Sequence, residues 1–284
     1  MTPEEAAALA RRAFGDPGEL VLLRASDAFT FRGPGAIVRV TPTALRAGQH
    51  VAAELEAVAR LSAAGAPVPA PLGPPVGVDG ATVTAWEDVP DDGARDDAAY
   101  AAMGRALATL HAVGGRLLHQ RALQPRPWQP LQWLEERLDR AGAAADPGLA
   151  AALRERAAAE AAGLSGEETL LHTDAHAANF RVAAGRAVLV DLEGLTRGPW
   201  RYDLAPMAVG ERRYGGDPAL WRAMAIAYGT DPDDPALLPA IRLRELLAVG
   251  YVIAQAASDP DAMAVARGRF ADVEAGNDAI WHLR

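Results

Sequence analysis

Residues 170–193 read Leu-Leu-His-Thr-Asp-Ala-His-Ala-Ala-Asn-Phe-Arg-Val-Ala-Ala-Gly-Arg-Ala-Val-Leu-Val-Asp-Leu-Glu, and this stretch decides the fold. An apolar run leads into a loop that carries His172, Asp174 and Asn179. A short glycine-containing hairpin then returns the chain and places Asp191 beside them. The stretch therefore predicts that these polar groups share one site, which could hold a metal ion and a phosphate.

The spacing His-x-Asp-x4-Asn, followed by a strand that ends in Asp, is typical of the catalytic loop and metal-binding motif of protein-kinase-like phosphotransferases. Within that superfamily the chain resembles the aminoglycoside phosphotransferase and choline kinase branch, whose loop typically reads His-Gly-Asp-x-His-x-x-Asn. Downstream, Gly198-Pro-Trp-Arg-Tyr-Asp-Leu-Ala matches the Gly-x-x-x-x-Asp-Leu-Ala of the branch. The resemblance runs from about Leu20 to Ala256, and its specific part is the segment 170–205.

This resemblance implies a small-molecule kinase, and the chemistry of phosphoryl transfer explains the residue types. Asp174 is expected to orient and deprotonate the acceptor hydroxyl. Asn179 and Asp191 are expected to bind Mg²⁺, a hard cation that takes few protein ligands and several phosphate oxygens. His172 is expected to hold the loop by hydrogen bonds, and Asp203 to support it by binding its backbone.

Two other interpretations remain open at this point. A kinase fold without catalytic activity that binds nucleotide or metabolite is the stronger rival, because Thr173 replaces the usual Gly of the loop and the expected phosphate-covering segment is not Gly-rich. Alternatively, His172, Asp174 and His176 could form the zinc site of a hydrolase. The six His of the chain supply no second cluster for such a site, and the intact Asp191 favours the active kinase.

The composition excludes several classes of function. The chain has 284 residues, half of them hydrophobic, so it is long enough to form a sizeable core. It contains no Cys, which excludes disulfides and a thiol nucleophile. A net charge of −9 argues against a nucleic-acid partner. The sequence has no signal-peptide pattern and no apolar run of membrane-spanning length, so a cytoplasmic protein without a membrane partner is expected.

The basic residues are all arginine: the chain has 28 Lys plus Arg, and none of them is Lys. Any cation that anchors phosphate must therefore be Arg. Arg39 lies in a strand predicted over 36–40, where the branch has Lys or Arg to bind the α- and β-phosphates. Glu54, in a helix predicted over 44–64, is its expected ion-pair partner, and Ser26 begins the segment expected to cover the phosphates of ATP or GTP.

A strand predicted over 81–86 leads into an acidic loop, and the join resembles the hinge of kinases. Backbone groups of Ala85, Trp86 and Glu87 are expected to hydrogen-bond the purine. The lobe boundary is placed here, which gives an N-terminal lobe of residues 1–86 and a C-terminal lobe of residues 87–284.

The C-terminal lobe is predicted to be mainly helical. The predicted helices span 97–113 (ending at Gly114-Gly115), 131–141, 147–162, 220–228, 236–256 and a stretch from about 261. The expected acceptor contacts are His176, Glu193, Glu211 and Glu245. Because these carboxylates and an acidic cluster beyond the hinge carry negative charge, a cationic acceptor such as an amino sugar is expected.

The sequence thus predicts an α+β, two-lobed, protein-kinase-like fold with a small antiparallel-sheet N-lobe and a mainly helical C-lobe. The predicted reaction is direct transfer of the γ-phosphoryl group of ATP or GTP to a hydroxyl of a small molecule, with Mg²⁺ as cofactor.

Overall fold

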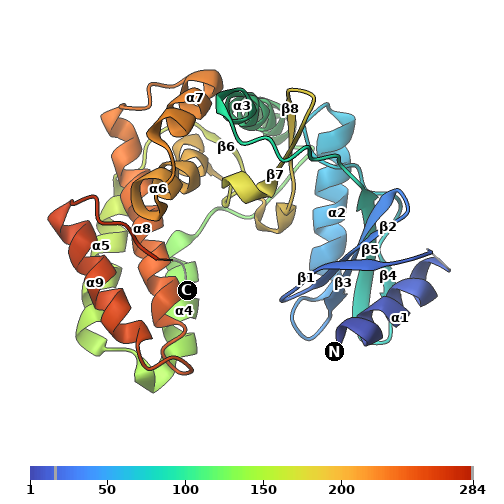
Figure 1. Ribbon diagram of the computed structural model, residues 1–284, viewed down its shortest axis with the longest axis horizontal. Coiled ribbons are helices and arrows are strands. Elements are labelled where there is room, and N and C mark those ends of the chain that lie inside the picture. The colour runs from blue at the N-terminus through green and yellow to red at the C-terminus, as the bar shows by residue number, and fades with distance from the viewer. Residues whose placement is uncertain (16–17, 283–284) are drawn as a thin grey trace.

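The computed structural model describes residues 1–15 and 18–282 and forms two lobes (Figure 1). The smaller lobe contains a five-stranded antiparallel sheet in the order β1-β2-β3-β5-β4. Its strands are β1 (Val21–Ala25), β2 (Phe29–Gly33), β3 (Ala36–Pro42), β4 (Val76–Val78) and β5 (Ala81–Glu87). The larger lobe is mainly helical, which confirms the predicted fold class. Residues 16–17 and 283–284 of the two expected lobes lie outside the described residues.

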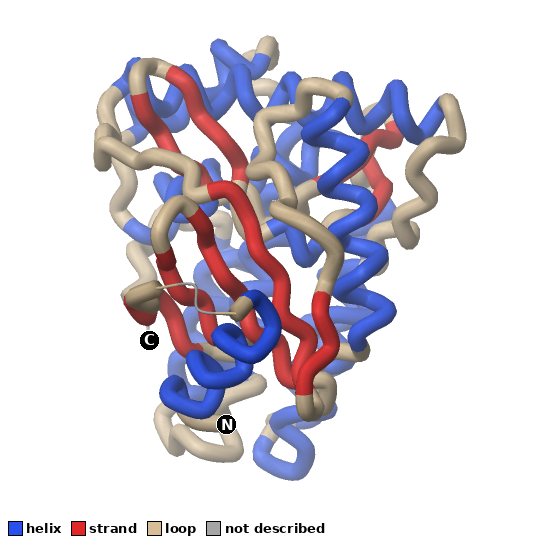
Figure 2. The backbone as a smooth tube through the Cα atoms, turned by 90° about the vertical axis from the view of Figure 1, so that its right-hand side faces the viewer, coloured by secondary structure: helices blue, strands red, loops and turns tan. Residues whose placement is uncertain are grey.

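Helix α1 (Pro3–Phe14) covers one face of the sheet, as Figure 2 shows with the sheet toward the viewer. A capping box starts the helix: the Thr2 side chain accepts a hydrogen bond from the Glu5 N–H, and the Glu5 carboxylate accepts one from the Thr2 N–H. The buried residues of α1 pack on alternate, inward-facing residues of the strands. This small core contains Ala6, Leu9, Ala10, Phe29, Phe31, Val38, Val40, Ala81 and Val83.

Helix α2 (Gly48–Ala63) begins later than the predicted start at Ala44. The backbone N–H groups of Leu45 and Arg46 donate to the Pro42 carbonyl oxygen, at 3.0 and 3.1 Å, and this turn replaces the expected first helical turn. The apolar side of α2 joins the core of the larger lobe. As a result the small lobe is fixed to the large one, and Arg46 lies outside the helix.

The larger lobe consists of seven α-helices, two short pairs of strands and several 3₁₀ turns within the described residues. The helices are α3 (Asp97–His119), α4 (Pro130–Ala141), α5 (Pro147–Ala162), α6 (Ala205–Tyr214), α7 (Pro218–Tyr228), α8 (Leu238–Ile253) and α9 (Ala262–Ala275). The strand pairs are β6 (Glu168–Leu171) with β9 (Thr196–Pro199), and β7 (Phe180–Ala183) with β8 (Arg186–Leu189). No helix within residues 1–15 and 18–282 is long and apolar enough to cross a membrane.

Helix α3 continues through Gly114-Gly115 to His119, so the prediction that it ends at the two glycines was wrong. Their small size has another purpose. A Cβ on Gly114 would lie 2.5 Å from the Leu170 Cβ, closer than two carbon atoms can approach. The glycines therefore let α3 pack closely against β6, the strand that leads into the loop with Asp174.

Candidate active site

The loop after β6 is held by a buried carboxylate. Asp203, which is fully buried, accepts hydrogen bonds from the backbone N–H groups of His172 and Thr173, both at 2.6 Å. Its Oδ2 also lies 3.0 Å from Nε2 of His111, whose Nδ1 lies 2.8 Å from the Tyr228 hydroxyl. The loop is thereby tied to α3 and α7, and the Asp203 contact is the one expected from the Asp-Leu-Ala motif.

His172 uses both of its ring nitrogens inside the loop. Nε2 donates to the Val190 carbonyl oxygen at 2.9 Å, and Nδ1 accepts from the Asp174 N–H at 3.3 Å. A zinc ligand needs a free ring nitrogen. Moreover, no group of three or more metal-binding side chains was found in the part of the chain that the structure describes. The geometry therefore disfavours the zinc site of His172, Asp174 and His176.

Thr173 adopts the backbone conformation that glycine favours at this position, with φ of +71°. Its side chain is buried, and its Oγ1 donates to the Gly194 carbonyl oxygen at 3.3 Å. The replacement of Gly by Thr therefore leaves the loop geometry and its support by Asp203 intact. This removes one of the two sequence features that favoured an inactive kinase fold.

Asp174 points into the cleft with its side chain 44% exposed. Its Oδ1 accepts a hydrogen bond from Arg244 of α8 at 2.5 Å, and its Oδ2 lies 3.4 Å from Nε2 of His176. Burial alone would raise the pKa of Asp174, but His176 and the charge of Arg244 together hold the pKa well below its usual range. The carboxylate is therefore ionised at neutral pH, as a hydrogen-bond acceptor for an attacking hydroxyl must be.

Asn179 and Asp191 line the same cleft as Asp174. The Asn179 side-chain amide donates to the Asp174 carbonyl oxygen at 2.9 Å, which leaves its Oδ1 as the atom available to a cation. Asp191 has a left-handed backbone (φ 64°, ψ 56°), and its carboxylate faces Arg24 of β1 at 3.3 Å. One amide oxygen and one carboxylate suit Mg²⁺, so these two residues fit the expected metal.

On the other wall of the cleft, Arg39 belongs to a cluster of four charged side chains. Its guanidinium lies 3.9 Å from Glu54 and also pairs with Glu193. Arg46 bridges the same two carboxylates, at 2.5 Å from Glu54 and 3.3 Å from Glu193. Burial lowers the pKa of Arg39, while Glu54 and Asp191 oppose that shift. Glu193, expected to contact the acceptor, lines the cleft and pairs with Arg39 and Arg46.

Arg46 was not predicted as a partner of Glu54 and Glu193, because the sequence pattern predicted a regular helix over 44–64 that includes it. The turn before α2 was the only signal that could have revealed it. Arg24, Arg137 and Arg244, which line the cleft as Arg46 does not, were missed as well, and no pattern in the sequence distinguishes them from surface arginines.

The hinge differs in detail from the prediction. Trp86 and Glu87 line the cleft and Ala85 does not. The Ala85 carbonyl oxygen accepts from the Leu72 N–H at 2.8 Å, and the Glu87 N–H donates to the Ala70 carbonyl oxygen at 2.9 Å. These two backbone groups are therefore already occupied by the extended segment before β4.

Asp88 and Val89 follow directly and also line the cleft, as does Ser26 at the tip of the β1–β2 hairpin. Residues 86–89 thus form a continuous segment that lines the cleft at the expected hinge. The whole cleft has a volume of about 1080 Å³ and lies between the sheet, the catalytic loop and helices α4 and α8.

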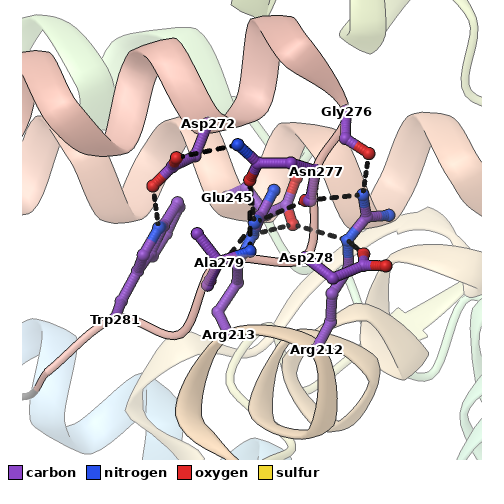
Figure 3. Close-up of polar contacts among 9 residues, drawn as sticks. All are labelled: Arg212, Arg213, Glu245, Asp272, Gly276, Asn277, Asp278, Ala279 and Trp281. Atoms are coloured by element: carbon purple, nitrogen blue, oxygen red, sulfur yellow. Dashed lines mark hydrogen bonds and ion pairs between the residues drawn. The ribbon is translucent and has the colours of Figure 1, made fainter.

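Two expected acceptor contacts lie elsewhere. Glu245 is 1% exposed, and its Oε1 accepts a hydrogen bond from Nε of the fully buried Arg213 at 2.6 Å. Figure 3 shows that this ion pair, together with Arg212, holds the C-terminal segment 276–281. Glu211 does not line the cleft either, and burial raises its pKa. The expectation that these two residues bind the acceptor is therefore corrected.

The model of the Phosphotransferase enzyme family, known as APH, matches residues 24–239 of the chain. The chain belongs to this family, and it is a phosphotransferase that acts on hydroxyl groups. A search of the curated proteins found no match.

Solved structures show the same fold at low sequence identity. The choline/ethanolamine kinase family protein of Mesorhizobium loti has a TM-score of 0.68 and 22% identity, over 97% of this chain and 94% of that one. The amicoumacin kinase hAmiN, in complex with AMP-PNP, Ca²⁺ and Ami, has a TM-score of 0.73 and 15% identity, over 97% of this chain and 93% of that one. APH(2″) of type IIIa, in complex with GDP and kanamycin, has a TM-score of 0.70 and 16% identity, over 96% and 99%.

Proposed function

We propose that this protein transfers the γ-phosphoryl group of ATP or GTP to a hydroxyl of a small molecule, with Asp174 as the base. The observation that carries the proposal is the meeting of Asp174, Asn179, Asp191 and Arg39 in one cleft. These side chains come from two lobes and from distant parts of the chain. Together they provide the base, the metal ligands and the phosphate anchor that phosphoryl transfer requires.

The nucleotide would lie between the sheet and the catalytic loop. Arg39 is positioned by Glu54 and can hold two phosphate oxygens with its fork of N–H groups. The β1–β2 hairpin, with Ser26 at its tip, would cover the phosphates, and Asp88 and Val89 would lie beside the purine, because all three residues line the cleft. Arg24 would then release Asp191, because phosphate oxygens offer the guanidinium a stronger partner.

Asn179 Oδ1 and Asp191 would hold Mg²⁺, which neutralises the charge of the phosphates when it is bound. His172 and Asp203 keep these ligands in place, because they fix both ends of the loop that presents them. Glu193, which also pairs with Arg46, holds Arg39 together with Glu54. The cleft thus presents its charged groups before the substrates arrive, and little reorganisation is needed during the reaction.

In the proposed step the acceptor oxygen attacks the γ-phosphorus in line with the bond to the nucleoside diphosphate. A bond forms between the acceptor oxygen and phosphorus. The bond between phosphorus and the β–γ bridging oxygen breaks, and its electron pair leaves on that oxygen. Asp174 accepts the proton of the acceptor hydroxyl, which the low pKa of the carboxylate allows only as the oxygen–phosphorus bond forms.

The test is Asp174→Asn, with Asp139→Asn as the matched control on the exposed surface of α4. Nucleotide consumption is measured over a panel of amino sugars, aminoglycosides, choline-like amines, sugars, sugar acids, sugar phosphates and nucleosides. We expect the kcat of Asp174→Asn to fall about 10²- to 10⁴-fold while its affinity for nucleotide stays near that of the wild type. A variant that keeps more than about a tenth of the wild-type kcat would remove Asp174 from this role.

A further inference from the structure

The acceptor half of the cleft is lined by arginines and aromatic rings. Helices α4, α6, α8 and α9 form this wall, and their charged and aromatic residues in it are Trp133, Arg137, Tyr214, Arg244, Tyr251 and Arg269. These helices contribute no carboxylate to the lining within the described residues. Asp174 of the catalytic loop contacts this wall, because Arg244 pairs with it.

Arg137, like Arg269, has no acidic partner among the described residues, and it is the one of the two whose contacts lie within the wall. Its Nη1 donates to the Leu247 carbonyl oxygen at 2.8 Å, and its guanidinium lies 5.8 Å from the centre of the Tyr251 ring. No carboxylate of the described residues lies within ion-pair distance of it. Burial lowers the pKa of Arg137 most, the neighbouring charge of Arg244 lowers it further, and Tyr202 and Asp174 oppose the shift. The remaining N–H groups of Arg137 are available to a ligand in the cleft.

Arg269, the third arginine of the wall, has a structural role. Its guanidinium lies over the rings of Trp281 and Tyr214 and donates to the His282 carbonyl oxygen. The side chain is 7% exposed and holds the C-terminal segment behind the wall. Two guanidinium groups of this wall, Arg137 and Arg244, therefore remain for a ligand. The carboxylate that contacts them is that of Asp174, through Arg244.

Several of the acidic residues that suggested a cationic acceptor have arginine or backbone partners. Asp88 lies 3.0 Å from Arg32, and Asp91 lies 3.3 Å from Arg95. Asp92 accepts backbone hydrogen bonds in the loop beyond the hinge, and Asp96 caps the N-terminus of α3. Glu193 and Glu245 have the arginine partners described above. These contacts offset part of the negative charge, so the number of acidic residues does not by itself favour a cationic acceptor.

We propose that the acceptor is a hydroxyl compound that carries an oxyanion, either a carboxylate or a phosphate, and that Arg137 and Arg244 bind this group while the hydroxyl faces Asp174. This inference rests on the proposed kinase function and names its class of substrate. The planar fork of a guanidinium matches both kinds of oxyanion. Tyr251 and Trp133 give the carbon skeleton an apolar surface on which to lie. An ammonium group at the same place would meet two like charges.

The experiment uses the full chain saturated with AMP-PNP and Mg²⁺, so that added anions cannot occupy the phosphate site. Calorimetry then measures binding of four probes with matched carbon skeletons: glucose, glucosamine, gluconate and glucose 6-phosphate. We expect one or both anionic probes to bind more tightly than glucose, and glucosamine to bind no more tightly than glucose. A preference for gluconate or for glucose 6-phosphate identifies the oxyanion as carboxylate or phosphate.

Arg137→Gln is expected to weaken binding of the anionic probe about 10- to 100-fold and to leave AMP-PNP binding unchanged. Arg137→Lys should restore part of the affinity, because it keeps the charge and loses the fork. Arg140→Gln, which changes an exposed arginine of the same helix, is the control for net charge and should change nothing.

The inference is overturned if the anionic probes bind no more tightly than glucose, or if Arg137→Gln leaves their affinity unchanged. It is also overturned if the acceptor that the enzyme phosphorylates fastest is neutral or cationic, in which case the kinase function stands. If Mg²⁺-dependent AMP-PNP binding is absent from the wild-type protein, the proposed function itself fails.

Discussion

The catalytic loop contains a β-branched residue in the left-handed region, and this arrangement predicts an unusual order of stabilities. The φ of Thr173 is +71°, where an L-residue costs about 1–2 kcal/mol relative to its ordinary conformation. The buried side chain offsets part of this cost: its hydrogen bond to the Gly194 carbonyl oxygen contributes about 0.5–1.5 kcal/mol, and its methyl group about 0.8 kcal/mol. Thr173→Ala loses both contributions and keeps most of the strain.

We therefore expect Thr173→Ala to lower the free energy of unfolding by about 1–2 kcal/mol. Thr173→Gly loses the same contacts but removes the strain, against an added backbone entropy cost of about 0.5–1 kcal/mol. The Gly variant should thus be more stable than the Ala variant, by up to about 1 kcal/mol. In a helix or strand interior the order of these two residues is the reverse.

Gly194 provides a second, coupled perturbation. A Cβ at this position would lie 2.4 Å from Thr173 Oγ1 and 3.0 Å from the His172 carbonyl oxygen. Gly194→Ala should therefore cost about 1–3 kcal/mol, as overpacking usually does. In the Thr173→Gly background the closest contact is gone, so the cost should shrink and leave a coupling energy of about 1 kcal/mol.

Urea unfolding measures these differences in the free energy of unfolding. It is applied to the wild type, the three single variants and the Thr173→Gly/Gly194→Ala double variant. Gly210→Ala is the control, because a Cβ on this helical glycine would meet no atom within 4 Å. If Thr173→Ala is at least as stable as Thr173→Gly, the loop does not hold residue 173 in a strained conformation. An equal cost of Gly194→Ala in both backgrounds would refute the packing of the two residues against each other.

Three further predictions concern the cleft. Asp191→Ala should abolish Mg²⁺-dependent nucleotide binding in calorimetry, and Asn179→Ala should weaken it less, because a charged ligand contributes more to the binding of a hard cation. If the Asp191→Ala variant binds nucleotide as the wild type does, the proposed metal site is contradicted. Arg39→Ala should raise the KM for nucleotide, and an unchanged KM would make Arg39 an ordinary strand residue. Because the pKa of Asp174 is depressed below 3.8, its charge and any stability linked to it are present above that pH and are lost only as the pH falls through the lower, folded-state value. The kcat/KM should thus show no loss from titration of Asp174 between pH 8 and pH 5. Arg244→Gln should move the acid limb of the pH profile of kcat/KM to higher pH. If the acid limb stays at the same pH, Arg244 does not lower the pKa of Asp174.

The segment 170–205 could be read from the sequence because its function depends on local spacing. His172, Asp174 and Asn179 share one loop, and the β7–β8 hairpin determines where Asp191 returns. Such features are set by a few consecutive turns and strands, so a one-dimensional pattern contains most of the information about them. The Asp203 contact joins distant residues and was expected only from the resemblance of residues 198–205 to the family motif.

Other features depend on contacts between distant elements, and the sequence did not reveal them. Gly114 looks like a helix stop, yet its small size serves the packing of α3 on Leu170. Ala85 lies at the expected hinge, but its carbonyl oxygen accepts a hydrogen bond from the Leu72 N–H, in a segment that pairs with the end of β5. Arg46 leaves its helix because a turn at Pro42 delays the start of α2.

The sign of the charge in the acceptor space shows why counting charges in a sequence can mislead. The chain has a net charge of −9, but a carboxylate contributes little to the field of the cleft once an arginine lies beside it. Asp91 and Glu193 illustrate this, since each has two arginine partners. What a ligand meets is the charge that remains after such pairing. Along the helical wall of the described cleft that remainder includes the guanidinium of Arg137, which only the folded structure separates from the other arginines of the chain.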